Sequence, residues 1–443
     1  MDPRFRAYAE LNAPRYTSYP TAPHFNEAVD GAVFARWLGA LDPAASVSFY
    51  LHVPYCREIC WYCGCNTFAV QRDEPLQDYV AALEQELRAV AAATPARRVR
   101  EIHWGGGTPN ILAPAQFRSI VEQLRSVFDL SDVREHALEA DPRVLSPLQC
   151  VTYATAGITR VSLGVQDVNP RVQAAIGRIQ PLKIVAAAFA SLRAAEIRNI
   201  NADLMYGLPL QSVADACHSA REIAALGPNR ISVFGYAHVP WFKTRQRLID
   251  ETALPGTTER IDQAEAIRET LVGAGYQAIG FDHFAKPDDS LAIAARHGDL
   301  HRNFQGYVDD DCDALIGVGA SAISTLPMGY AQNASDVTGW TTRLKAHGFA
   351  TARGRALTEE DKTRRALIEQ ILCAFEVDLR DLGGAEAYRS ELDRLAPLAA
   401  DGLCAIENGR ITIPEQAQFL ARIVAQEFDT YRAESGARHS KAV

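Results

Sequence analysis

The strongest constraint on the fold is an alternation of short strand-like runs with amphipathic helices between about Val47 and Ala285. The strand candidates are rich in β-branched and aromatic residues: VSFYLHV, REIHW, HALEA, RVSLGVQ, INADLMY, RISVFGY and YQAIGF. In the stretch 76–90, apolar residues recur at three- and four-residue steps, which is typical of a helix packed on a sheet. Further helices are expected at about 115–128, 182–195, 213–226 and 258–273.

This alternation predicts parallel strands joined by right-handed helical crossovers. A closed barrel has eight strand–helix units in about 250 residues, whereas only six or seven units are recognisable in this chain. We therefore expect an α/β fold with a partial (β/α) barrel.

The flanking segments have a different character and predict three domains. Residues 1–40 include APRYTSYPTAPHF, which has neither periodicity and is expected to form an extended N-terminal arm. Residues 41–326 would form the catalytic partial barrel. Residues 327–443 are expected to be a mainly helical C-terminal domain, with a short strand in GRITIPEQ and a last helix over 414–432.

Composition excludes several classes of protein. A net charge of -9 argues against general nucleic-acid binding, which needs a basic footprint. No apolar run approaches the roughly 20 residues that span a bilayer, and the N-terminus lacks the apolar region of a secretory signal. We expect a cytoplasmic protein that does not bind membranes and is monomeric. Nine cysteines in such a chain are unlikely to form disulfides.

Four of the nine cysteines lie in one loop directly after the first predicted strand, in the run CREICWYCGC that begins at Cys56. Thiolates from Cys56, Cys60 and Cys63 can bind three irons of a 4Fe–4S cluster. The fourth iron then stays open and can bind the amino and carboxylate groups of S-adenosylmethionine (SAM). Electron transfer through that iron would cleave SAM and release a 5′-deoxyadenosyl radical.

A structural zinc site is the alternative interpretation of this loop. Closed zinc sites need four ligands, usually in two separated pairs, and the sequence has no second pair. Cys65 could in principle be a fourth ligand, but it lies only two residues beyond Cys63. The ligand count therefore favours the cluster.

Polar and glycine-rich motifs lie at the predicted carboxyl ends of successive strands. They are Gly105–Pro109, Glu139–Pro142, Gln166 with Asp167, Asp203 with Tyr206–Gly207, and Tyr236–His238. Taken singly, each has an ordinary explanation as a turn, a solvated charge or a helix cap. Their common position at the edge where α/β barrels carry active sites favours function. Glycine amides could approach the methionyl part of SAM, and Glu139 or Asp203 could bind its ribose hydroxyls. Arg178 could pair with a carboxylate.

Several motifs together resemble the oxygen-independent coproporphyrinogen III oxidases, which are radical SAM enzymes. They are PRYTSYPTA, YLHVPYCREICWYCGC, HWGGGTP, EADPR, GVQD, DLMYGLP, FGYAHVPW, FDHFAKPDD, HRNFQGY and GVGASAIS. The resemblance covers nearly the whole chain. Gly235 and Trp61 stand where the family often has other residues, but neither position is an expected ligand.

The resemblance implies a reaction in haem biosynthesis. Two propionate side chains of coproporphyrinogen III become vinyl groups, which gives protoporphyrinogen IX and carbon dioxide. The radical abstracts a hydrogen from the propionate β-carbon, and loss of carbon dioxide and one electron follows. A flavodoxin or ferredoxin is the usual class of electron donor.

The resemblance also implies a set of site residues and two bound SAM molecules. Cys56, Cys60 and Cys63 would hold the cluster, with Cys65 a neighbour rather than a ligand. The first SAM would contact Tyr50, Tyr62, Gly106, Glu139 and Ile323. The second would contact Gly107, Thr108, Gln166, Arg178, Asp203 and Ala237.

Substrate binding is less well specified by the sequence. Candidates for a basic lining that accepts the propionates are Arg15, His24, Lys243, Arg245 and Arg302, although each can equally be an ordinary surface charge. Two other functions stay open: a radical SAM enzyme acting on another tetrapyrrole, and a non-enzymatic haem carrier. Cys65 and the PRYTSYPTA arm favour the enzyme over the carrier.

Overall fold

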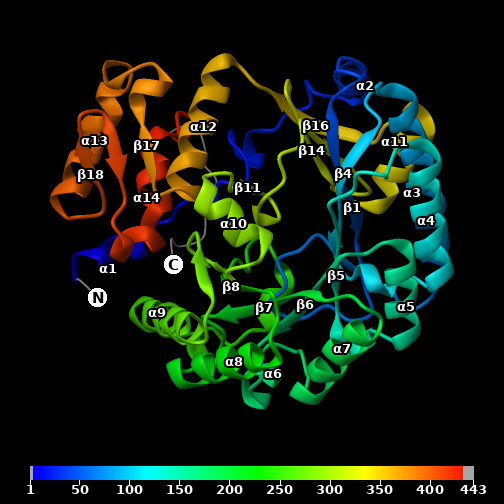
Figure 1. The fold of residues 1–443 in the computed structure, drawn as a ribbon, viewed down its shortest axis with the longest axis horizontal. Coiled ribbons are helices and arrows are strands. Elements are labelled where there is room, and N and C mark those ends of the chain that lie inside the picture. Colours follow the sequence, from blue (N-terminus) through cyan, green and yellow to red (C-terminus); the bar gives the residue numbers. More distant parts are fainter. Residues whose placement is uncertain (1–2, 433–443) are drawn as a thin grey trace. The chain divides into compact units, whose positions relative to one another are not determined.

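A computed structural model describes residues 3–432, and the chain divides into two compact units (Figure 1). Unit 2 consists of residues 25–203 and 312–356. Unit 1 consists, within the described residues, of 3–24, 204–311 and 357–432. The ends of the predicted arm and C-terminal domain, 1–2 and 433–443, lie outside the described residues. Because both units are discontinuous in sequence, the three consecutive domains remain a prediction.

Unit 2 is built on a parallel sheet in which four strands match predicted ones and a fifth, β13, was not predicted. Its central strands are β1 (Ser46–Val53), β4 (Arg98–Gly106), β5 (Glu135–Ala140) and β6 (Arg160–Gln166), and β13 (Ala314–Val318) lies on the other side of β1. Neighbours in the order β13-β1-β4-β5-β6 pair in parallel. Every residue of β1 is buried, as expected for a strand covered on both faces. Three antiparallel strands continue the sheet beyond β13: β14 (Ile323–Leu326), β15 (Gly329–Asn333) and β16 (Thr351–Ala356).

Helices in unit 2 cover this sheet with their apolar faces. Figure 1 shows α3 (Glu74–Ala93), α4 (Pro114–Val127) and α5 (Pro147–Ala156) side by side along β1, β4 and β5. Leu83 and Leu87 of α3 and Phe117 and Leu124 of α4 are fully buried against it. The unit also contains α2 (Gly31–Gly39), α6 (Pro170–Ala175), α7 (Leu182–Ala194) and α11 (Val337–His347). The strand β7 (Asn199–Tyr206) spans the division between the units.

Unit 1 combines helices with short antiparallel strands. The helices are α1 (Pro3–Ala9), α8 (Val213–Leu226), α9 (Thr257–Gly273), α10 (Ser290–His297), α12 (Glu359–Cys373) and α13 (Arg389–Ala400). The strands include β8 (Arg230–Gly235), β9 (Gln277–Ile279) and β10 (His283–Ala285), then the pair β11 (His301–Asn303) and β12 (Gly306–Val308). A small sheet near the C-terminus contains β17 (Glu376–Asp378), β18 (Ala405–Glu407) and β19 (Arg410–Thr412).

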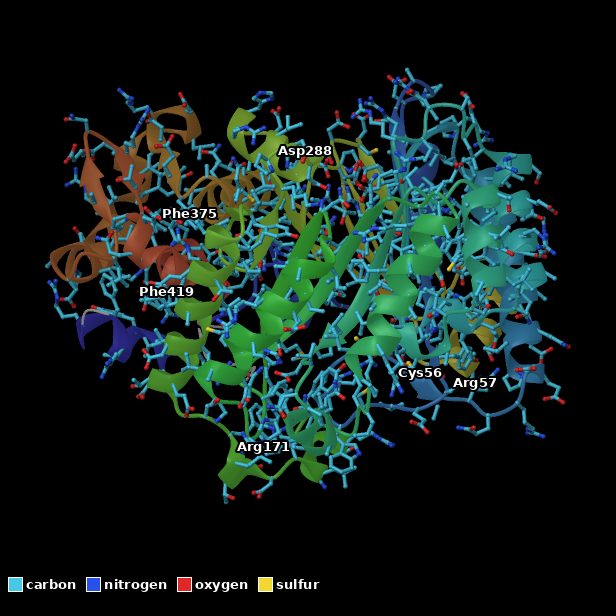
Figure 2. The ribbon with its side chains drawn as sticks, turned by 60° about the horizontal axis from the view of Figure 1, so that its bottom comes forward. Cys56, Arg57, Arg171, Asp288, Phe375 and Phe419 are labelled. Carbon is cyan, nitrogen blue, oxygen red and sulfur yellow. The ribbon has the colours of Figure 1, made fainter. Side chains whose placement is uncertain are left out.

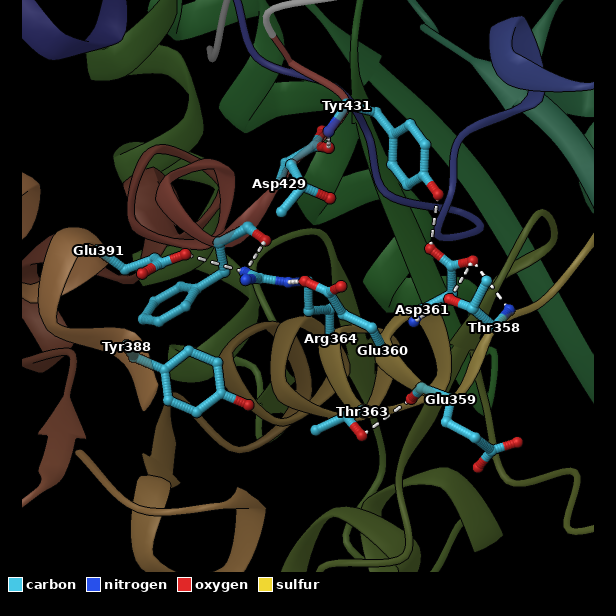
Figure 3. A network of polar contacts seen from close by, with 12 residues as sticks. Thr358, Glu359, Glu360, Asp361, Thr363, Arg364, Tyr388, Glu391, Asp429 and Tyr431 are labelled. Atoms are coloured by element: carbon cyan, nitrogen blue, oxygen red, sulfur yellow. Dashed lines mark hydrogen bonds and ion pairs between the residues drawn. The ribbon is translucent and has the colours of Figure 1, made fainter. Parts of the chain in front are cut away.

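A polar network fastens the C-terminal segment to α12 (Figure 3). Arg364 donates through Nη1 to Glu391 Oε1 at 3.1 Å and to the Phe428 carbonyl at 3.0 Å. Its Nε donates to Glu360 at 2.9 Å, and Tyr431 donates its hydroxyl hydrogen to Asp361 at 2.8 Å. The segment is therefore held by hydrogen bonds as well as by its apolar side chains.

Two sequence-based expectations about elements are wrong. The predicted strand YQAIGF is not a parallel unit, because β9 pairs antiparallel with β10. Only three residues separate these strands, too few for the crossover that a parallel pair needs. The predicted last helix is broken into the 3-10 turn Glu415–Leu420, α14 (Ala421–Ala425) and the 3-10 turn Gln426–Phe428. Arg364 donates a hydrogen bond to the carbonyl of Phe428, and the chain does not continue as a helix there.

The predicted arm is partly helical rather than wholly extended. Residues 1–40 contain α1 and α2, although the APRYTSYPTAPHF run itself is irregular apart from the short turn Ala22–His24. Among the described residues, no helix has the length and apolar character needed to cross a membrane.

Candidate active site

The cysteine loop starts where unit 2's central strand ends. Cys56 lies in the two-residue strand β2 (Tyr55–Cys56), which pairs with β3 (Phe68–Ala69), and Figure 2 labels it. A backbone hydrogen bond from Trp61 to Ile176 fastens the middle of the loop. Cys60 is 6% exposed, whereas Cys65 is exposed. The Cys65 residue is exposed as a whole, but its thiol hydrogen-bonds with that of Cys63, so the sulfur atoms of this loop lie near one another.

The first sulfur atom lies between two hydroxyl groups. Cys56 Sγ is 3.0 Å from Thr108 Oγ1 and 3.3 Å from Thr67 Oγ1. Burial raises the pKa of the Cys56 thiol, and the two threonine hydroxyls partly offset that effect. Thr108 follows the glycine run that ends β4, so the strand end and the cysteine loop meet at this sulfur.

The second sulfur atom is surrounded by positive charge. Arg178 Nη1 lies 3.4 Å from Cys60 Sγ, and Arg143 Nη2 lies 3.8 Å from it. Asp141 holds both guanidinium groups, at 2.6 Å from Arg143 and 3.2 Å from Arg178. Arg178 also donates to the Gly164 carbonyl at 2.6 Å. The two guanidinium groups therefore place positive charge beside the Cys60 sulfur.

These sulfur atoms suit a cluster better than a single ion. Thiolates on one tetrahedral zinc lie about 2.3 Å from the metal and therefore within about 4 Å of one another. Among the described residues, Cys56, Cys60 and Cys63 do not form a set whose ligand atoms all lie within 4.8 Å of one another. They are still close enough for the other two sulfurs to influence the pKa of Cys56. Three thiolates at this separation fit an iron–sulfur cluster.

The glycine run beside the loop makes room for the protein's own side chains. A Cβ atom on Gly105 would lie 2.9 Å from Glu139 Oε1 and 2.9 Å from the Tyr50 hydroxyl. One on Gly106, whose φ is +112°, would lie 2.6 Å from the His52 ring. Close packing is therefore one reason for these glycines, alongside the predicted approach of backbone amides to SAM.

Glu139 joins the strand end to this packed group. It lies near the carboxyl end of β5 and accepts a hydrogen bond from the Gly106 amide at 3.2 Å. The residue is exposed, although protein atoms surround its carboxyl group. Desolvation there, with the charge of Asp203, raises the pKa of Glu139 to about 7. This carboxyl group can therefore change its charge near neutral pH.

Most of the other predicted site residues lie in the same unit. The Tyr50 hydroxyl is 3.1 Å from His52 Nδ1, and burial raises the pKa of Tyr50. Gln166 ends β6 with a φ of +72°, and its amide lies beside Gly164 near the guanidinium of Arg178. The remaining residues are Tyr62 and Gly107 near the loop, Asp203 in β7 and Ile323 at the start of β14. Ala237 belongs to unit 1.

Sequence reasoning missed three residues of this group. Asp141 and Arg143 lie in the EADPR motif, in which only Glu139 was given a role. An aspartate two residues before an arginine could have indicated an ion pair between them. His52 contacts Tyr50 and lies 3.1 Å from the Asn66 carbonyl through Nε2. Burial lowers the pKa of His52 to about 4, so its imidazole is neutral at physiological pH.

Comparisons with known proteins agree with this geometry. The model of the Radical SAM superfamily matches residues 50–223. The chain is 46% identical to the oxygen-independent coproporphyrinogen III oxidase of Bradyrhizobium diazoefficiens, over 99% of this chain and 98% of that protein. The Escherichia coli protein of the same name is 38% identical, over 95% and 93% of the two chains. A solved structure described as coproporphyrinogen III oxidase (HemN) from Escherichia coli superposes with a TM-score of 0.90 and 37% identity, over 94% and 97%.

The fold, the cysteine loop and the family match define a radical SAM enzyme, a class that uses a 4Fe–4S cluster and SAM. Within that superfamily, the chain belongs to the oxygen-independent coproporphyrinogen III oxidases. The predicted fold class, an α/β partial barrel of the radical SAM type, is confirmed with it.

Proposed function

We propose that this protein converts two propionate side chains of coproporphyrinogen III to vinyl groups without oxygen, forming protoporphyrinogen IX and carbon dioxide. The observation that carries the proposal is the contact of Arg178 and Arg143 with Cys60 in the loop of a chain whose relatives bear the name of this activity. When bound, the cluster and SAM supply the 5′-deoxyadenosyl radical that begins each decarboxylation.

Cys56, Cys60 and Cys63 are the proposed cluster ligands, and Cys65 is not one. The hydroxyls of Thr67 and Thr108 and the guanidinium of Arg178 would stabilise charge on the ligand sulfurs. Asp141 pairs with both Arg178 and Arg143 and offsets part of their charge. The thiol of Cys65 hydrogen-bonds with that of Cys63, so Cys65 is proposed as a neighbour of the cluster rather than a ligand.

Two SAM molecules are proposed to bind along the strand ends. Tyr50, Tyr62, Gly106, Glu139 and Ile323 are assigned to the first, and Gly107, Thr108, Gln166, Arg178, Asp203 and Ala237 to the second. The close approach of Gly105, Glu139 and Tyr50 supports a preorganised first site. For the second site, the support is that Gln166 and Arg178 both lie beside Gly164.

The remaining parts of the proposal concern partners and setting. We propose a flavodoxin or ferredoxin as the one-electron donor, and a cytoplasmic monomer as the working form. Coproporphyrinogen III is the proposed substrate because the relatives are named for it.

Anaerobic incubation of the reconstituted protein with coproporphyrinogen III, SAM and a one-electron reductant tests the function. We expect protoporphyrinogen IX and one carbon dioxide for each vinyl group formed. Consumption of SAM without a vinyl product would contradict the substrate assignment and favour another tetrapyrrole. Tight haem binding with no SAM cleavage would favour the carrier function instead.

A further inference from the structure

Unit 1 contains a cavity of about 960 Å³ whose lining includes no residue of the cysteine loop. Its lining comes from three separate stretches of that unit, within 4–15, 206–302 and 401–422. The volume is near the upper end of the range for small-molecule sites, so the cavity suits a large ligand. Of the sequence-based candidates for a basic lining, Arg15 and Arg302 line it, whereas His24, Lys243 and Arg245 do not.

Four guanidinium groups meet in this cavity, two of which the sequence did not single out. Arg302 comes from β11, Arg260 from α9 and Arg422 from α14, and Arg15 precedes the TSYPTA run. The side chain of Arg302 is only 6% exposed. It lies 4.6 Å from the ring centres of both Phe281 and Tyr307, which fix its plane by cation–π contacts.

Part of this hydrogen-bonding capacity is unused by the protein. In the part of the chain that the structure describes, Nε and Nη1 of Arg302 and Nε of Arg260 are buried with no hydrogen-bond partner. Buried donors without a partner are costly, so native proteins rarely leave them so unless a ligand or water meets them. Arg15 reaches a backbone carbonyl, that of Gly235, at 3.5 Å.

Positive charge exceeds negative charge at the centre of the cavity. Asp282 is the carboxylate nearest the four arginines, with 3.8 Å between its Oδ1 and Arg302 Nη1, and it is also 2.7 Å from His283 Nδ1. Two other lining carboxylates are already paired, Asp401 with Tyr8 and Glu415 with Arg268. Glu265, the remaining one, lies on the exposed face of α9.

The arginines influence one another strongly. Burial, followed by the charges of Arg15 and Arg302, lowers the pKa of Arg422 to about 10. Burial, and to a smaller extent the charge of Arg15, also lowers the pKa of Arg260. Like charges held this close favour binding of an anion, since an anion would relieve the repulsion.

Aromatic side chains form part of the rest of the lining. Phe5, Phe281, Phe284, Tyr206 and Phe419 contribute to it, and Figure 2 labels Phe419. Trp241, which is 51% exposed, lies at the same cavity. A flat apolar ligand with several carboxylates matches this combination of aromatic walls and clustered guanidinium groups.

We propose that Arg15, Arg260, Arg302 and Arg422 bind the propionate carboxylates that the substrate keeps during a given decarboxylation. The identity of the ligand as a tetrapyrrole rests on the proposed function. A carboxylate held by guanidinium groups is stabilised as an anion, whereas a carboxylate that leaves as carbon dioxide must give up those bonds. This cluster therefore suits the propionates that stay rather than the one that reacts.

Equilibrium binding of coproporphyrin III and protoporphyrin IX to the reconstituted enzyme, followed by fluorescence, tests the proposal. The test variant is Arg260→Gln/Arg302→Gln, and the control is Arg389→Gln, an exposed arginine paired with Glu386 away from the cavity. We expect the double variant to raise the Kd of both porphyrins by about 100-fold, roughly tenfold for each lost charge-assisted contact. The control should match the unmodified enzyme.

An unchanged Kd in the double variant, with vinyl product still formed by the unmodified enzyme, would overturn the arginine site and leave the proposed function intact. A raised Kd in an enzyme that forms no vinyl product would support the site and contradict the function. Weakened binding of coproporphyrin III alone would overturn the assignment to retained propionates.

A measurement on the unmodified enzyme keeps the proposal testable if the double variant fails to fold. Arg15 is exposed, so phenylglyoxal can modify it in the free enzyme. Bound coproporphyrin III should slow this modification about tenfold at saturating ligand, without protecting Arg389. Equal modification of Arg15 with and without the porphyrin would overturn the proposal.

Discussion

Arginine side chains gather in two regions of this molecule, but in only one of them does every arginine have a close carboxylate partner. In unit 2, Asp141 pairs with both Arg143 and Arg178, and these arginines contact Cys60. In unit 1, the arginines around Asp282 outnumber their carboxylate partners. In the first arrangement both arginines share a carboxylate of the protein, whereas in the second an anionic ligand would supply the missing partners.

The largest expected effect is on the cysteine loop. Cys60→Ser should abolish iron retention and product formation, because it removes a proposed ligand and the sulfur that Arg178 contacts. Cys65→Ser, the matched control in the same loop, should keep the cluster. Iron and sulfide analysis of both reconstituted variants measures this. Equal iron loss would remove the distinction between Cys65 and the three proposed ligands.

Removing an arginine that is paired with a carboxylate should lower the free energy of unfolding. Arg178→Met should lower the free energy of unfolding by about 3 kcal/mol, since it breaks a buried ion pair and leaves part of the charge of Asp141 uncompensated. Urea denaturation of the protein without ligands measures the change. Arg171→Met, on the exposed side of α6 (Figure 2), serves as the control and should change it by less than about 0.5 kcal/mol.

The two regions should also respond differently to pH. Glu139, with its pKa raised to about 7, is ionised above neutrality and gains a proton as the pH falls. SAM affinity should therefore drop about tenfold between pH 8 and pH 6 if the carboxylate binds the ribose hydroxyls. Porphyrin binding in the cavity should stay level from pH 7 to pH 9, because even Arg422, with its pKa lowered to about 10, keeps its charge there.

Isothermal titration of SAM and fluorescence titration of coproporphyrin III across this range measure both profiles. Glu139→Gln should bind SAM with the weaker affinity at every pH, since an amide resembles the protonated acid. A Glu139→Gln variant that keeps the original pH slope would exclude Glu139 as its source.

The smallest expected effect has the opposite sign. Arg260→Met should raise the free energy of unfolding of the ligand-free protein by about 1 kcal/mol, because it removes a buried charge that repels its neighbours. Arg268→Met, on the same helix but 44% exposed and paired with Glu415, is the control. If Arg260→Met lowered the free energy of unfolding in urea denaturation, the cavity arginines would be stabilised by protein partners, as those near Cys60 are by Asp141.

Local patterns predicted much of the chain from β1 to α9, in both units. The strands β1, β4, β5, β6, β7 and β8 and the helices α3, α4, α7, α8 and α9 lie within a few residues of their predicted positions, because each follows a regular repeat. The segment 414–432 misled the same reasoning. Its residues from Ala421 to Phe428 are buried on nearly every side, so an apolar run there does not report helical periodicity.

The site was predictable to the extent that its residues share a motif. Cys56, Cys60 and Cys63 are neighbours in sequence, and the strand-end residues follow a repeating rule. Arg15, Arg260, Arg302 and Arg422 come from parts of the chain that no local pattern connects. Only the folding of unit 1 brings them together, which is why Arg260 and Arg422 could not be recognised beforehand.

The stoichiometry of an anaerobic single-substrate reaction tests the central claim most directly. Products from coproporphyrinogen III would be quantified together with 5′-deoxyadenosine and carbon dioxide. The account predicts two molecules of carbon dioxide and two of 5′-deoxyadenosine for each protoporphyrinogen IX. Formation of 5′-deoxyadenosine with no carbon dioxide and no vinyl product would contradict it.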